Sequence, residues 1–177
     1  HRMAVEQRGL ENLRTCADAL PVLQRQEVRE LFERQGVLSP VELESRFEVY
    51  AEQYVLAIEV EAKLALQIAR TQVYPAAVRY LGELGKALQE QQAMGLHPNL
   101  NLRNQLGELL EQLNNGCDDL EQGLHSAPHD TEAHMRHCAD TLMPLIGTLR
   151  AAVDGLEALV DNDLWPLPSY QEMLFVR

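Results

Sequence analysis

One stretch of this sequence, LSPVELESRF at residues 38–47, fixes the start of a helix more firmly than any other. Ser39 can accept a hydrogen bond from a backbone N–H of the first turn, and Pro40 suits the first helical position. Glu42 lies three residues after Ser39, which completes a capping box. Apolar and aromatic residues then recur every three or four positions, as on one face of a helix. All but two members of this series, Glu61 and Gln72, are apolar or aromatic. The residues at this spacing are Leu43, Phe47, Tyr50, Tyr54, Ile58, Glu61, Ala65, Ile68 and Gln72.

The same periodicity continues past Pro75 to about Met94, where Gly95 is suited to end a helix. A single helix over 40–94 would be roughly 80 Å long at ~1.5 Å per residue. That length exceeds a small domain. We therefore expect this helix to kink at Pro75 or to project from the body of the protein.

Two further long segments have helical composition. One runs from about Leu100 to Asn114 and onward to about residue 124, after a turn at 95–99. The other runs from about Thr131 to Leu159, with Asp130 as its N-cap and a second kink expected at Pro144.

Short helices are predicted within 16–35, with an interruption at Pro21. No segment alternates apolar and polar residues between turn signals, so no strand is predicted. The predicted fold is all-α. It is a helical bundle built on two or three long antiparallel helices, with short N-terminal helices and an extended, Pro-containing C-terminal tail.

A chain of 177 residues can form one domain with a substantial core. We divide it into a joining segment at 1–15, a helical bundle at 16–164 and an apolar strap at 165–177. The formal net charge of −12 argues against a nucleic-acid partner and against a polybasic membrane anchor. No apolar run approaches the roughly 20 residues that span a bilayer. Cys16, Cys117 and Cys138 form an odd, sparse set, as expected for a reducing cytoplasm.

A histidine-rich segment at 125–138 contains the strongest candidates for metal ligands. His134, His137 and Cys138 are spaced so that one helix could bring them near one face, where they could bind a divalent transition metal. Solvated surface histidines are the favoured interpretation. No phosphate-binding loop, nucleophile elbow or Glu-x-x-His motif is present. No catalytic, cofactor or metal site is therefore assigned.

Two acidic residues on the long helix, Glu59 and Glu61, have apolar neighbours. We expect one of them to be partly buried and paired with an arginine from another helix.

The chain ends in DLWPLPSYQEMLFVR, which is unlike anything before it. The two prolines favour an extended backbone, and an extended apolar segment is suited to lie in a groove. The groove could belong to this bundle, or to another domain or subunit. The predicted interaction residues are Trp165, Leu167, Tyr170, Met173, Leu174 and Phe175.

Three stretches, at 8–21, 36–80 and 163–177, resemble the helical C-terminal part of type III glutamine synthetases, in the same order along the chain. The resemblance implies a parent enzyme that joins ammonia to glutamate using ATP and Mg or Mn. It implies no catalytic residue and no cofactor in this segment. The implied partners are an upstream catalytic domain and neighbouring subunits of a homo-oligomer.

We expect a non-catalytic domain that serves oligomer assembly or regulation. Two alternatives stay open at this point. One is a free-standing helical module for protein–protein interaction, and the other is a His/Cys metal-binding helical bundle.

Overall fold

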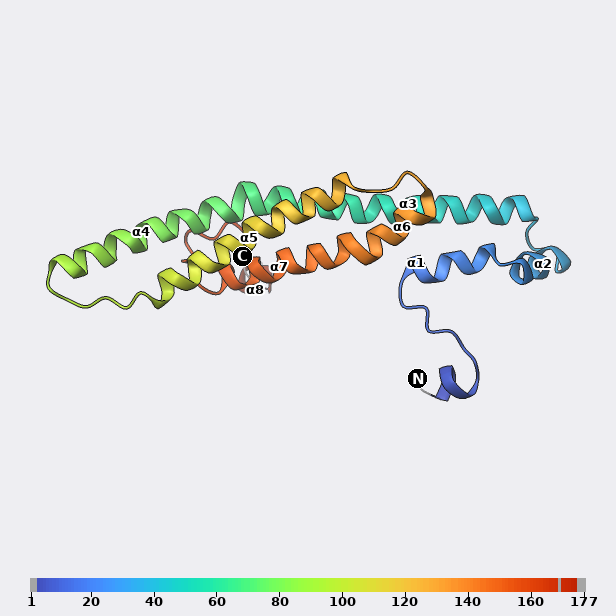
Figure 1. Cartoon of the computed structure of the whole chain (residues 1–177), viewed down its shortest axis with the longest axis horizontal. Coiled ribbons are helices and arrows are strands. Elements are labelled where there is room, and N and C mark those ends of the chain that lie inside the picture. The colour runs from blue at the N-terminus through green and yellow to red at the C-terminus, as the bar shows by residue number, and fades with distance from the viewer. Residues whose placement is uncertain (1–2, 169, 175–177) are drawn as a thin grey trace. The chain divides into compact units, whose positions relative to one another are not determined.

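A computed structural model describes residues 3–168 and 170–174 of the chain (Figure 1). The described residues contain helices and no strand, which confirms the all-α prediction. The chain forms two compact units. The first comprises the described residues within 1–60 and 127–142, and the second those within 61–126 and 143–177.

The first unit contains short helices within 16–35, as predicted, and a π-helical segment before them that the sequence did not indicate. Thr15 caps one of them through a capping box, because its hydroxyl accepts from the backbone N–H of Asp18 while the Asp18 carboxylate accepts from that of Thr15. Pro21 lies in a 3-10 segment between two α-helices, which is the interruption that the sequence indicated. These elements are η1 (Met3–Gln7), α1 (Cys16–Ala19), η2 (Leu20–Gln24) and α2 (Gln26–Arg34).

The long helix α3 (Pro40–Ile68) starts at the residue that the capping box predicted. The Ser39 backbone N–H donates to Glu42 Oε2 at 2.8 Å, and the Glu42 N–H donates to Ser39 Oγ at 3.3 Å. The two residues therefore satisfy orphan donors of the first turn reciprocally.

The core of the first unit joins α1 and α3 to α6 (Thr131–His137). Ala17, Phe47, Ala51 and Met135 are buried together, and Met135 is fully inaccessible. The N-cap of α6 is Asp130, as predicted, and its carboxylate accepts from the Ala133 N–H at 2.9 Å.

Both mid-helix prolines follow a π-helical turn. η3 (Ala69–Val73) precedes α4 (Tyr74–Ala93), which contains Pro75, and η4 (Cys138–Leu142) precedes α7 (Met143–Glu157), which contains Pro144. Proline has no N–H to donate, and its ring crowds the carbonyl four residues earlier. In a π-turn the backbone hydrogen bonds span five residues instead of four, so a different carbonyl faces the position of the proline. The sequence predicted kinks here, and the structure places a π-turn before each proline.

The second unit is built on α4, α5 (Asn101–His125) and α7, and α5 packs along both of the others (Figure 1). Gly116 lies where α5 packs against α7, and a Cβ at this position would be in van der Waals contact with Leu149 Cδ1, at 3.4 Å. The buried face of α5 carries leucines at helical spacing, namely Leu106, Leu110, Leu113 and Leu120.

The end of α4 is also where the sequence placed it. Gly95 has a φ of +80°, a conformation that glycine adopts without strain. The Leu96 N–H donates to the Gln91 carbonyl at 3.0 Å, which closes the helix end as in a Schellman motif.

The C-terminal tail is non-helical at 165–168 and forms a short helix, α8, at Tyr170–Leu174. The extended part of the tail is therefore shorter than the sequence predicted, because helical backbone resumes two residues after Pro168. Phe175 lies outside the described residues.

Candidate functional site

The sequence-predicted metal candidates lie in the first unit, where α6 faces α3. His134 Nε2 is 3.1 Å from Glu59 Oε1, and each of these side chains is about one-fifth exposed, at 20% and 21%. The contact lacks the alignment of a hydrogen bond, so it is an electrostatic contact that is charged on both sides only when the imidazole is protonated. The half-buried glutamate predicted on α3 is thus Glu59, and a histidine from α6 is in contact with it. Glu61 is exposed.

Cys138 follows α6 and is completely inaccessible. Burial raises the pKa of its thiol to about 11, and the nearby Glu59 carboxylate adds to the rise. His137 is half-buried. Across residues 3–168 and 170–174, no three His, Cys, Asp or Glu side chains meet in the way that a metal ion requires.

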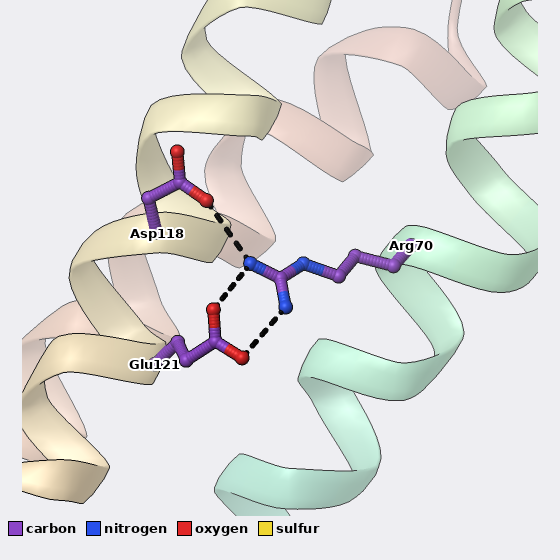
Figure 2. Close-up of polar contacts among 3 residues, drawn as sticks. All are labelled: Arg70, Asp118 and Glu121. Atoms are coloured by element: carbon purple, nitrogen blue, oxygen red, sulfur yellow. Dashed lines mark hydrogen bonds and ion pairs between the residues drawn. The ribbon is translucent and has the colours of Figure 1, made fainter.

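A second meeting of charged side chains lies in the second unit (Figure 2). Arg70 in η3 donates through Nη1 and Nη2 to the two carboxylate oxygens of Glu121 on α5, at 2.9 and 2.8 Å. Its Nη2 also donates to Asp118 Oδ1 at 3.0 Å. The Arg70 guanidinium holds the pKa of Glu121 below its usual value. The three charges link η3 to α5 at the surface, and this arrangement stabilises structure rather than supplying an acid or a base.

An apolar groove of about 200 Å³ lies between α3–η3 and α7 in the second unit. Two alanines on the α3–η3 side leave room for it beside two β-branched side chains, and three apolar side chains and one arginine line the α7 side. Arg150 is the charged residue of its lining, and its side chain is 73% exposed. The lining includes Ala65, Ile68, Ala69, Ile146, Arg150 and Val153.

The predicted interaction residues of the tail fall into two groups. Trp165 and Leu167 are half-buried, whereas Met173 and Leu174 are 54% and 75% exposed. Trp165 Nε1 is buried without a hydrogen-bond partner. The side chain of Tyr170 lies outside the described part of the chain, as Phe175 does.

Sequence reasoning did not find the Arg70 cluster or the groove. Each joins helices that are far apart in the chain, and no local spacing signals such a pairing. Chemically, an apolar groove and exposed apolar side chains suit binding to another protein surface. Among the described helices, none combines the length and apolar character needed to span a membrane.

Comparison with known proteins gives one consistent result. Residues 2–92 match the family model described as the glutamine synthetase C-terminal domain. Over 182 residues the chain is 29% identical to the type-3 glutamine synthetase of Dictyostelium discoideum, covering 96% of this chain and 24% of that protein. It is 24% identical over 180 residues to a glutamine synthetase of Bacteroides fragilis (strain YCH46), covering 96% of this chain and 25% of that protein. The chain thus spans about a quarter of the length of the curated relatives it matches.

Proposed function

Since the chain belongs to the glutamine synthetase C-terminal domain family, we propose that it is the non-catalytic helical domain of a type III glutamine synthetase and acts in oligomer assembly. Its partners in this proposal are the catalytic domain of the same polypeptide and neighbouring subunits.

A row of exposed apolar side chains on α3 carries the proposal. Val49, Leu56 and Val60 are separated by seven and four residues, so they lie on one face of the helix. They are 46%, 64% and 54% exposed, while Phe47, Ala51 and Ile58 on the opposite face are buried. We call these three exposed residues the α3 apolar row. A helix that is apolar on two faces is typical of one that packs on both.

The parent reaction joins ammonia to glutamate with ATP and Mg or Mn, and we assign no step of it to residues of this chain. In this proposal, ATP and the metals bind in the rest of the enzyme. The helical domain contributes surfaces that hold the subunits in place.

The test uses the complete parent enzyme. Its oligomer size and its rate of glutamine formation are measured with and without the segment that corresponds to residues 8–177. Assembly by this domain predicts that truncation breaks the oligomer and that activity falls with it. Oligomers that survive truncation with unchanged turnover would overturn the assembly role. A lost response to metabolites in such oligomers would assign the domain to regulation instead.

A surface variant refines this test without removing the domain. Leu56→Glu places a charge in the α3 apolar row and is expected to weaken the oligomer. Met94→Glu changes a residue that is 70% exposed and lies outside the row, so it serves as the matched control.

A further inference from the structure

We infer that the apolar groove between α3–η3 and α7 receives the α8 segment of a second copy of this chain. In this arrangement Met173 and Leu174 lie in the groove and Glu172 faces Arg150. The inference rests on the proposed role in assembly and names a surface and an occupant for it.

The groove has the chemistry of a site for aliphatic side chains. Ala65 and Ala69 leave space on one wall, and Ile146 and Val153 present branched apolar side chains on the other. The cavity of about 200 Å³ opens at the protein surface. Water in contact with such a lining is displaced favourably by apolar groups.

The α8 segment offers the groups that fit this groove. Met173 and Leu174 are adjacent residues, and both are more than half exposed. Large exposed side chains next to one another on a short terminal helix bury apolar area only against another surface. Glu172 precedes them directly, so a carboxylate accompanies the apolar pair.

The groove and α8 both belong to the second unit. The α8 segment could therefore fill the groove of its own chain but does not, which favours a second copy as the source of the occupant. Among the described residues, α8 contributes none to the lining of the groove. Within one chain, Met173 and Leu174 thus stay exposed although the groove lies in the same unit. When α8 of one copy lies in the groove of another, the exposed apolar surface of both is buried.

The charges of the two parts are complementary. Arg150 contributes the charge at the groove, and its Nε lies 3.6 Å from Asp154 Oδ2 on the next turn. A guanidinium has five N–H donors, so Arg150 can bind a second carboxylate through its terminal nitrogens. Glu172 of a docked tail supplies that carboxylate. Two apolar side chains and one exposed ion pair give weak association in isolation, which simultaneous contacts in an oligomer strengthen.

Cross-linking between differently labelled copies tests the inference directly. In a background with Cys16→Ser, which removes the exposed native cysteine, one copy carries Leu174→Cys and the other Val153→Cys. Mild oxidation of the mixture is expected to give a disulfide-linked heterodimer. Met94→Cys replaces Leu174→Cys in the control, because Met94 is similarly exposed at 70%, and is expected to give only background cross-linking.

A charge exchange tests the orientation. Glu172→Arg on the copy with the tail cysteine is expected to lower the heterodimer yield several-fold. Adding Arg150→Glu to the copy with the groove cysteine is expected to restore most of that yield. Both residues are exposed, so neither change removes a core contact.

Two results would overturn the inference. One is a heterodimer yield no higher than that of the Met94→Cys control. The other is a single chain with both cysteines that closes on itself while mixed copies do not cross-link, which would show that the tail covers its own groove. Truncation of the complete enzyme reports separately on the assembly role, so failure of the tail contact and failure of the proposed function are distinguishable.

Discussion

Arg70 holds both carboxylate oxygens of Glu121, at 2.9 and 2.8 Å, across a sequence separation of 51 residues. The contact is a bidentate arginine–carboxylate pair, in which two N–H groups of one guanidinium donate to the two oxygens of one carboxylate. It fixes the π-turn before α4 against α5, and the adjacent Asp118 reinforces it. Removing one partner therefore has a predictable effect on the stability of the second unit.

We expect Glu121→Gln to lower the free energy of unfolding at pH 7 and to lose that effect in acid. Arg70 holds the pKa of Glu121 below its ordinary value of 4.5, so the carboxylate stabilises the fold fully above pH 4.5. This contribution disappears as the pH falls through the lowered pKa of the folded state. Denaturant unfolding from pH 7 to pH 3 measures the difference between the two proteins. Glu111→Gln, at an exposed site on α5, is the control, and an equal effect at both positions would contradict this prediction.

Ser39→Ala is expected to destabilise the first unit by about 1 kcal/mol, because the first turn of α3 loses its capping hydroxyl. Thermal or denaturant unfolding measures the change. Ser45→Ala makes the same substitution at an exposed position inside α3, where alanine favours the helix. A loss of stability at Ser45 as large as that at Ser39 would refute the capping role.

Substitutions at two glycines on different helices are expected to change the free energy of unfolding in opposite directions. Gly82 is exposed within α4 and has no neighbouring atom within 4 Å of an added Cβ, so Gly82→Ala should stabilise by about 0.5–1 kcal/mol. At Gly116 an added Cβ would already lie 3.5 Å from the Leu149 Cα. Gly116→Leu is therefore expected to destabilise by about 1–3 kcal/mol through overpacking of α5 against α7. Urea unfolding of both variants checks the signs, and equal signs would be inconsistent with the helix contact.

Two of the three cysteines, Cys16 and Cys138, are expected to react with an alkylating reagent in a fixed order. Cys16 is exposed and should react first in the native protein. Cys138 is fully buried, and its raised pKa of about 11 keeps it protonated at pH 8. Its thiolate fraction rises roughly tenfold for each pH unit below the pKa, so labelling should accelerate from pH 8 to pH 9. Mass spectrometry of the labelled peptides follows each site. The order should vanish in denaturant, and native labelling of Cys138 as fast as Cys16 would count against its burial.

Local signals in the sequence predicted the helix boundaries well. Ser39, Asp130 and Gly95 each act through backbone groups only a few residues away, so their roles follow from spacing alone. The buried face of α3 was equally accessible to prediction, because its periodicity repeats over several turns. An exception is Tyr50, which shares the spacing and is 45% exposed.

Contacts between distant segments could not be predicted in this way. Nothing in the sequence indicated that α6 would bring His134 into contact with Glu59. The groove beside Ala65 exists because α7 lies opposite. The spacing of apolar residues along α3 does not show which helix will pack against it. In the tail, Pro166 and Pro168 indicated extended backbone. A proline restricts only its own φ and the residue before it, so it does not predict the helix that begins at Tyr170.

The π-turns at Ala69–Val73 and Cys138–Leu142 have a consequence for how chains of this family vary in length. Inserting or deleting one residue in an α-helix rotates everything beyond it by ~100° and turns a buried face outward. A π-turn contains one residue more than an α-turn, so deleting one residue there restores the α-helical phase instead of disturbing it. Homologues that have lost the proline after either turn are therefore expected to show single-residue gaps at these two places, with the buried faces of the flanking helices kept in register.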